Sequence, residues 1–175
     1  MRGYDIMAEF KTIAPQEIAD NPFKLIGDDW GLVTAGGQDG INTMTVSWGG
    51  VGVLWGKPAA FIFIRPQRYT FEFIENTDFF TISFFDGGFR KALGFCGSKS
   101  GRDVDKVKET GLTPAFSDEG APYFEEARMV LVCKKLYGQF LSEEGVSDGA
   151  AVLPNYNGGD WHKMYVGEIV KVLTK

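Results

Sequence analysis

Short apolar runs rich in β-branched and aromatic residues, separated by glycine and proline, dominate the pattern of hydrophobic and polar positions along the chain. Such runs are typical of β-strands, and polar glycine-rich segments between them are typical of tight connections. The pattern predicts strands over residues 30–35, 41–48, 59–65, 79–85, 127–141 and 164–173. The glycine loop 36–40 is predicted to join the first two strands as a hairpin.

Three other stretches follow the spacing of a helix, in which residues three and four apart share a face. They cover residues 69–75, 89–95 and 104–110. Gly94 or Gly97 would end the second helix and Gly111 the third, because glycine is common just beyond a helix. The strands have short connections, whereas parallel strands need longer crossovers. We therefore predict a mainly β fold, an antiparallel barrel with a few short helices.

The length of 175 residues fits one domain over residues 1–175, with no internal repeat or low-complexity linker. Hydrophobic residues make up 44% and charged residues 23%, which is typical of a globular protein. Two features are unusual, because the chain has 23 glycines and its aromatic content reaches 14%. Many rings beside many backbone bends indicate strands around something on which rings can stack.

Charge and cysteine usage exclude several classes of partner. The formal charge of −5 disfavours nucleic acid and anionic membranes. Cys96 and Cys133 form neither a CxxC pair nor a zinc-ligand pattern, so both are predicted to be buried thiols in a reducing compartment. Residues 1–12 lack the apolar core of a signal peptide, and no apolar run approaches the roughly 20 residues that span a bilayer. By elimination, we expect a cytoplasmic protein.

The strand over 42–48 carries a row of small hydroxyls. Asn42, Met44 and Val46 would point one way and the row Thr43, Thr45 and Ser47 the other. One interpretation is a half-exposed strand in which threonine is simply favoured. The other is a rim along which an aromatic heterocycle lies, its ring heteroatoms meeting hydroxyls and main-chain N–H groups.

Two basic segments are candidate anion sites. Residues 65–70 join a strand to a helix start and combine Arg65, Arg68 and a capping-type hydroxyl at Thr70, which would suit a phosphate. Residues 97–103 combine glycines, serines and Lys99 as in an anion nest, without the spacing of a Walker A loop. The alternatives are an ordinary helix cap with solvated arginines and a basic surface loop.

The single histidine, His162, precedes the last strand. If this segment is extended, Asp160 shares a face with it and its carboxylate could orient the imidazole or favour the protonated form. A lone histidine is more often structural, and nothing nearby supplies the further ligands of a metal site. A GxSxG nucleophile elbow is also absent, so we predict neither a metal centre nor a serine hydrolase.

In order and spacing, these segments resemble the flavin reductase-like family from about Phe23 to the C-terminus. The resemblance rests on residues 42–49, 57–58, 65–70, 80–85, 97–103 and 162–169. It implies a dimeric split β-barrel of Greek-key type that binds FMN. In that family the strand matching 43–48 runs along the isoalloxazine ring, and the two basic segments approach the ribityl phosphate.

The resemblance also implies roles for individual residues. The expected contacts to the ring are Thr43, Met44, Thr45, Val46, Ser47 and Trp48. The expected contacts to the phosphate are Arg65, Arg68, Tyr69, Thr70, Ser98, Lys99 and Ser100. His162 would face the incoming nicotinamide and position or polarise it, as the one catalytic residue.

The implied activity is hydride transfer from NADH or NADPH to the flavin, with the cofactor supplying the difficult chemistry. A GxGxxG fingerprint is absent, which fits a nicotinamide that enters only as a transient co-substrate. Reduced flavin would pass electrons to a redox protein or leave for a partner oxygenase. The alternatives are a flavoredoxin-like electron carrier, in which the Trp-rich segment 48–55 shields the ring, and a non-catalytic barrel that binds an apolar ligand or a protein.

Overall fold

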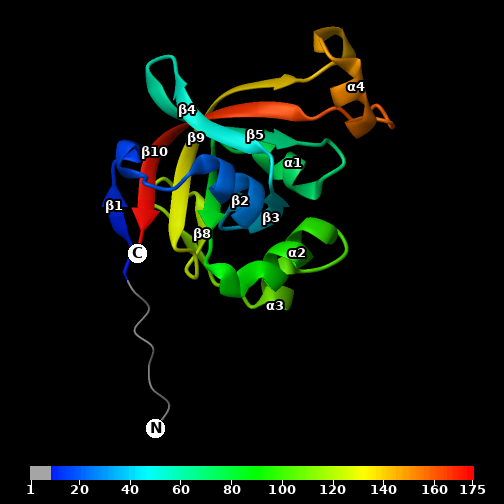
Figure 1. The fold of residues 1–175 in the computed structure, drawn as a ribbon. Helices are drawn as coiled ribbons and strands as arrows, with labels where there is room; N and C mark the ends of the chain where they lie inside the picture. Colours follow the sequence, from blue (N-terminus) through cyan, green and yellow to red (C-terminus); the bar gives the residue numbers. More distant parts are fainter. Residues whose placement is uncertain (1–8) are drawn as a thin grey trace.

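The computed structural model describes residues 9–175, and most of them form one curled antiparallel sheet (Figure 1). Eight strands belong to it, in the order β3-β2-β6-β9-β10-β5-β4, with β1 paired beside β10. Their bounds are β1 Lys11–Ile13, β2 Gly31–Gly37, β3 Gly40–Val46, β4 Gly49–Leu54, β5 Lys57–Ile64, β6 Phe79–Phe84, β9 Met129–Phe140 and β10 Lys163–Thr174. A separate pair is formed by β7 Pro114–Phe116 and β8 Pro122–Phe124.

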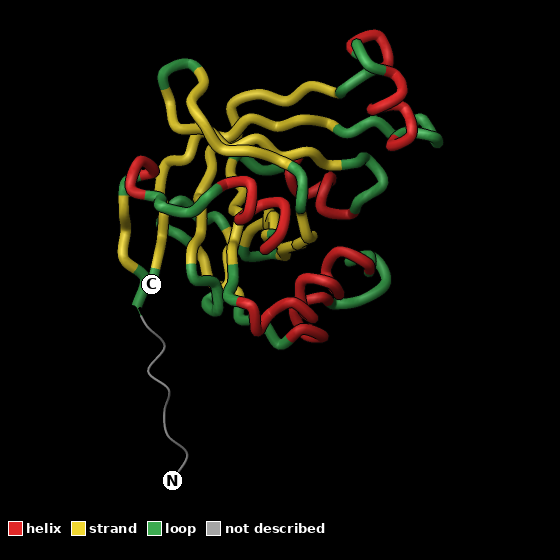
Figure 2. The backbone as a smooth tube through the Cα atoms, in the orientation of Figure 1, coloured by secondary structure: helices red, strands yellow, loops and turns green. Residues whose placement is uncertain are grey.

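The helices are short (Figure 2). The α-helices are α1 Tyr69–Glu75, α2 Arg90–Ser98, α3 Lys106–Thr110 and α4 Gly149–Val152, and a π-helix covers Lys24–Asp29. In Figure 1, α2 and α3 lie together beside β3, while α4 lies beyond the far ends of β9 and β10. None of the helices in residues 9–175 is long and apolar enough to cross a membrane.

The predicted mainly β, antiparallel fold with a few short helices is confirmed. Each predicted strand and helix is present within a few residues of its predicted ends, and Gly111 closes α3 with a φ of 70°. The expectation that Gly94 or Gly97 ends the second helix is wrong, because both lie within α2, which continues to Ser98 with Lys99 as its C-cap.

Four strands in residues 9–175 were not predicted: β1, β7 and β8, which are only three residues long, and β4, whose glycine-rich sequence is a weak strand signal. Of these, β4 is the longest. It pairs with β5 through a two-residue turn in which Trp55 and Gly56 both have positive φ, as a type I′ hairpin requires. The first eight residues, part of the segment without a signal peptide pattern, lie outside the described residues.

Strand alternation divides the buried side chains into two clusters. The larger cluster lies inside the curl of the sheet, and its members come from nearly every strand. The smaller lies between the outer face of the sheet and α2, α3 and β8. Cys133 belongs to the first and Cys96 to the second, and both are buried and unpaired, as predicted.

Gly167 marks a place where strands approach closely, next to a register shift in β10. A β-carbon there would lie 2.7 Å from the Phe80 ring and 2.9 Å from Cβ of Cys133, both fully buried. We expect Gly167→Ala to lower the free energy of unfolding by about 2 kcal/mol, because such overpacking forces the core to shift. Urea unfolding measures this. Gly52→Ala is the control, because a β-carbon at Gly52 has no neighbour within 4 Å, and equal stability of both variants would contradict the prediction.

Candidate functional site

Two adjoining hollows lie where the open edge of β3 meets the end of β5, the start of α1 and the segment before β10. The histidine hollow has a volume of about 150 Å³ and is lined by Met44, Thr45, Val46, Ser47, Trp48, Phe63, Arg65, Arg68 and His162. The lysine hollow has about 160 Å³ and is lined by Met44, Gln67, Arg68, Tyr69, Thr70, Lys99, Ser100, Gly101 and Lys106. Met44 and Arg68 line both, so the two hollows lie side by side.

All the predicted site residues except Thr43 and Ser98 line one of these hollows. Thr43 instead lines a neighbouring hollow of about 850 Å³, which shares Lys106 with the lysine hollow. Ser98 is the last residue of α2, and its Oγ donates to the carbonyl of Phe95 at 3.3 Å. The fold therefore brings four segments that are far apart in sequence to one place.

The threonine hydroxyls of β3 form hydrogen bonds within the protein. Thr43 donates to the carbonyl of Val33 at 3.1 Å and accepts from Thr34 at 2.9 Å, and Thr45 donates to the carbonyl of Leu93 in α2. The expectation of a hydroxyl row free for a ligand is thus corrected for both threonines, which tie β3 to its neighbours. Among the described residues β3 pairs only with β2, so alternate main-chain N–H groups on its other edge have no strand partner.

Arg65 holds the segment that precedes His162. Its guanidinium forms an ion pair with Asp160 and donates to the carbonyl of Asn155 at 2.8 Å. Asp160 also accepts from Gln67 at 2.6 Å, and these two donors hold the pKa of its carboxyl below the usual range. Asp160 therefore partners Arg65 rather than the imidazole, which corrects the expected Asp–His pair.

The start of α1 also differs from the expected cap. Arg68, not Thr70, occupies the N-cap position and makes no side-chain capping bond. Thr70 is buried and accepts from the side-chain amide of Asn42 at 2.7 Å, so it fastens α1 to β3. Arg68 donates to the carbonyl of Gly97 at 3.2 Å and thereby joins the two predicted anion segments.

The loop after α2 has a structured side and an open side. Ser100 Oγ accepts from the backbone N–H of Arg102 at 3.1 Å, which fixes the turn. Arg102 forms an ion pair with Glu72 and lies 4.7 Å from the centre of the Tyr69 ring, so its charge is already partnered. Lys99 forms no ion pair within residues 9–175 and is free to meet an anion in the lysine hollow.

His162 is buried, with 7% of its surface exposed. Its Nδ1 lies 2.8 Å from the hydroxyl of Tyr156, and the centre of its ring is 5.4 Å from that of Trp48. Burial, with a further contribution from Arg65, lowers the pKa of the imidazole to about 4. The expected tendency towards the protonated form is therefore wrong, and His162 is a neutral residue at pH 7.

Lys106 is the residue that sequence reasoning missed. Only 6% of its surface is exposed, and Nζ donates to the carbonyls of Thr43 and Cys96, each at 2.8 Å. No carboxylate partners it among the described residues, and burial lowers the pKa of its ammonium. In sequence it stands in the charged run 102–109, where a lysine normally faces solvent, so only the packing of α3 against β3 and α2 reveals it.

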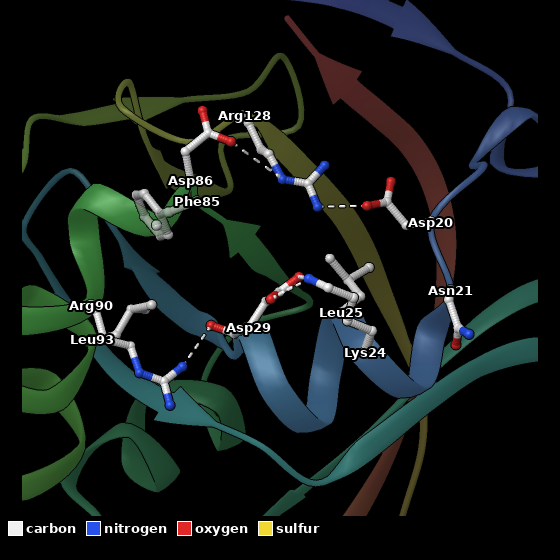
Figure 3. Close-up of a pocket in the computed structure, with 11 residues that line it drawn as sticks. Asp20, Asn21, Lys24, Leu25, Asp29, Phe85, Asp86, Arg90, Leu93 and Arg128 are labelled. Carbon is white, nitrogen blue, oxygen red and sulfur yellow. Dashed lines mark hydrogen bonds and ion pairs between the residues drawn. The ribbon is translucent and has the colours of Figure 1, made fainter.

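A larger hollow of about 530 Å³ lies elsewhere, beside the π-helix and the start of α2, and contains none of the predicted site residues (Figure 3). Its charged side chains already have partners within the protein: Arg128 pairs with Asp20, and Lys24 pairs with Asp29, both at 2.6 Å. Arg90 also lines this hollow; it donates to the carbonyl of Asp28 at 2.6 Å and lies over the Trp30 ring. Because this hollow has no lining residue in common with the two smaller hollows and contains no predicted site residue, the two smaller hollows are the candidate site.

Comparison with solved structures places the fold in a defined class. An FMN-binding protein from Thermus thermophilus is 22% identical, with a TM-score of 0.67 over 99% of this chain and 80% of that chain. Flavoredoxin from Methanosarcina acetivorans is 22% identical, with a TM-score of 0.66 over 84% of this chain and 68% of the other. The Streptomyces globisporus NADH:FAD oxidoreductase SgcE6 is 21% identical, with a TM-score of 0.60 over 82% and 73%. A putative flavin reductase from Shewanella frigidimarina, described as having a split barrel domain, is 23% identical, with a TM-score of 0.66 over 88% and 72%.

The fold is thus the antiparallel split barrel of flavin reductase-like proteins. The sequence model described as flavin reductase like domain matches residues 26–175, and the chain belongs to that family. The matched range agrees with the resemblance expected from about Phe23 onward. A search of curated protein sequences found no significant match.

Proposed function

We propose that the chain binds FMN, with the phosphate in the lysine hollow and the isoalloxazine ring in the histidine hollow. The observation that carries this proposal is Lys106, a buried ammonium with no carboxylate partner among the described residues. A buried charge is costly unless it is paired, so an anion is the ligand class that this hollow favours. Lys99 and Arg68 at the same hollow add two further cations in an otherwise acidic chain.

The histidine hollow suits a flat heterocycle. It combines Met44 and Trp48 with the open edge of β3, whose N–H groups can donate to ring oxygens and nitrogens. Because the hollows lie side by side and share Met44 and Arg68, one ligand with a ring at one end and a phosphate at the other would occupy both. Lys106, Lys99 and Arg68 would hold the phosphate, and the edge of β3 would hold the ring.

We further propose that the site is completed in a homodimer. The two hollows together, of about 150 and 160 Å³, only just reach the roughly 300 Å³ at which ligand pockets begin, so a partner surface would enclose the ligand more fully. Large apolar side chains are exposed on β4, the adjoining turns and β9, and such a surface is typical of a protein interface. These residues are Trp48, Val53, Trp55, Tyr137 and Phe140.

We also propose that residues 1–175 form a single domain and that the protein is located in the cytoplasm.

The activity that we propose is NADH- or NADPH-dependent flavin reduction, with bound FMN supplying the hydride-accepting ring. His162 would contact the nicotinamide or the ring and orient it, and Trp48 beside it would cover one side of the hollow. The ring of Trp55 instead lies 6.1 Å from that of Tyr137 and does not line the hollow. Of the segment 48–55, only Trp48 lines the hollow, so this segment shields the ring less than we would expect in a flavoredoxin-like electron carrier.

The test is anaerobic mixing of the FMN-loaded protein with NADH or NADPH in a stopped-flow instrument. We expect bleaching of the flavin absorbance, and we expect His162→Ala to slow it roughly tenfold while FMN stays bound, because only the orienting contact is lost. If neither nucleotide bleaches the flavin, the reductase proposal fails and the flavoredoxin-like electron carrier becomes the favoured function. Unchanged kinetics in the variant would make the histidine structural, and a protein that fails to bind FMN would be a non-catalytic barrel.

Lys99 provides a second test of the phosphate position. We expect Lys99→Ala to weaken FMN about threefold, because this lysine is exposed and solvent screens its charge. Riboflavin, which has no phosphate, should bind the variant and the unchanged protein equally. Titration of both flavins by fluorescence quenching measures this. Equal weakening of FMN and riboflavin would contradict a phosphate contact at Lys99.

A further inference from the structure

Several contacts hold Tyr156 against His162, and none of them was expected from the sequence. Its hydroxyl lies 2.8 Å from Nδ1 of the imidazole, and the two rings meet edge to face, 5.5 Å between centres. The Trp161 ring stacks on the phenol at 4.1 Å, and the guanidinium of Arg65 lies 5.3 Å from the centre of the phenol ring. Because Arg65 also binds Asp160 and Asn155, the phenol is fixed relative to β5 and β10.

The direction of the bond between Tyr156 and His162 follows from the chemistry of the two groups. A phenol is the stronger donor of the pair, and an unprotonated imidazole nitrogen is the stronger acceptor. The pKa of Tyr156 is raised, chiefly by burial, so its proton stays on the oxygen. The charges around the imidazole are Arg65, Arg68 and the carboxylate of Asp160.

Asp160 makes no hydrogen bond to the imidazole: Arg65 and Gln67 both donate to its Oδ2, and the bonded neighbour of the ring is Tyr156. A neutral imidazole carries one proton, and Nδ1 is the nitrogen that accepts from Tyr156. The remaining N–H therefore falls on Nε2, at the opposite side of a ring that lines the histidine hollow.

We infer that Tyr156 is a positioning residue that fixes His162 in the Nε2–H tautomer and makes it a hydrogen-bond donor towards the histidine hollow. A donor at this point selects ligands that present an acceptor there, such as a carbonyl oxygen or an unprotonated ring nitrogen. The identity of such a ligand as flavin or nicotinamide rests on the proposed function. The tautomer itself does not, because it depends only on contacts within the chain.

The chain contains one histidine, so a single imidazole contributes to its nitrogen spectrum. A long-range ¹H–¹⁵N correlation spectrum of the labelled full-length protein between pH 5 and 8 reports which nitrogen carries the proton. We expect an unprotonated Nδ1 and a protonated Nε2 throughout that range. A protonated Nδ1, or two tautomers in similar amounts, would overturn the inference.

Tyr156→Phe tests the role of the hydroxyl, since phenylalanine keeps the ring between Trp161 and Arg65. We expect the tautomer preference to fall on the order of fivefold, as the loss of one hydrogen bond implies. Tyr137→Phe is the matched control, because its hydroxyl bonds to Gln139 on the exposed end of β9. An unchanged imidazole spectrum in Tyr156→Phe would overturn the inference.

Flavin reduction gives a second, separable readout. In Tyr156→Phe loaded with FMN, we expect the rate of bleaching by NADH or NADPH to fall on the order of fivefold, with FMN affinity unchanged. If Tyr156→Phe loses the tautomer preference but its flavin is still bleached at the full rate, a positioning role for Tyr156 is contradicted. If the unchanged protein is not bleached at all, the reductase proposal fails, while the spectrum still decides the tautomer.

Discussion

Lys106→Met is expected to weaken FMN binding 50- to 100-fold and to leave riboflavin affinity within about twofold. A hydrogen bond to a charged group is worth about 1.5 to 3 kcal/mol, and about 1.4 kcal/mol corresponds to a factor of ten in affinity. Lys106 is buried, so solvent screens its charge far less than that of Lys99. Its effect should therefore exceed that of Lys99→Ala by more than tenfold.

Fluorescence quenching titrations of the two flavins measure the effect of Lys106→Met. Lys108→Met is the matched control, because Lys108 lies on the same helix and is exposed. Methionine at position 106 leaves the carbonyls of Thr43 and Cys96 without their donor, so some loss of stability is expected as well. Unchanged riboflavin affinity separates a phosphate effect from misfolding. Equal weakening of both flavins would contradict the assignment of the lysine hollow.

Acidification from pH 6.5 to 4.5 is expected to lower the free energy of unfolding by about 2 kcal/mol through His162 alone. Its pKa falls from 6.5 to about 4 on folding, so the unfolded chain binds the proton more readily than the native state. The stabilisation is fully present above pH 6.5 and is lost as the pH falls towards 4. Urea unfolding at a series of pH values measures this loss.

His162→Gln is the control for the pH dependence, because glutamine keeps polar atoms at this position and does not titrate. Carboxyls with a lowered pKa, such as Asp160 and Glu75, act in the same direction but lose their contribution only below their ordinary values near 4. The window between pH 6.5 and 4.5 therefore isolates the histidine. An equally steep loss of stability in His162→Gln would show that another group is responsible.

Local pattern predicted most of the fold, because strand alternation, helical spacing and Gly111 are properties of neighbouring residues. Which segments meet at the site came instead from the family resemblance, which rests on the order and spacing of the motifs. Local pattern missed the three-residue strands β1, β7 and β8. It also missed β4, whose glycines weaken the strand signal, although the turn at Trp55 and Gly56 and the register with β5 define it clearly.

The roles of individual side chains were harder to predict, because they depend on partners that are distant in sequence. Arg65, for which the resemblance implies a phosphate contact, also pairs with Asp160, and His162 has Tyr156 as its hydrogen-bond partner. The burial of Lys106 depends on three elements that meet only in the folded protein. Such pairings decide which charges remain free for a ligand, and no local pattern encodes them.

In the proposed function, one flavin occupies both hollows, with its phosphate at Lys106. The most direct measurement is a parallel titration of the purified, flavin-free protein with FMN and riboflavin, followed by quenching of flavin fluorescence. We expect FMN to bind at least about tenfold more tightly than riboflavin, because the phosphate adds charge-assisted contacts. Equal affinities, or no quenching by FMN, would contradict the proposal.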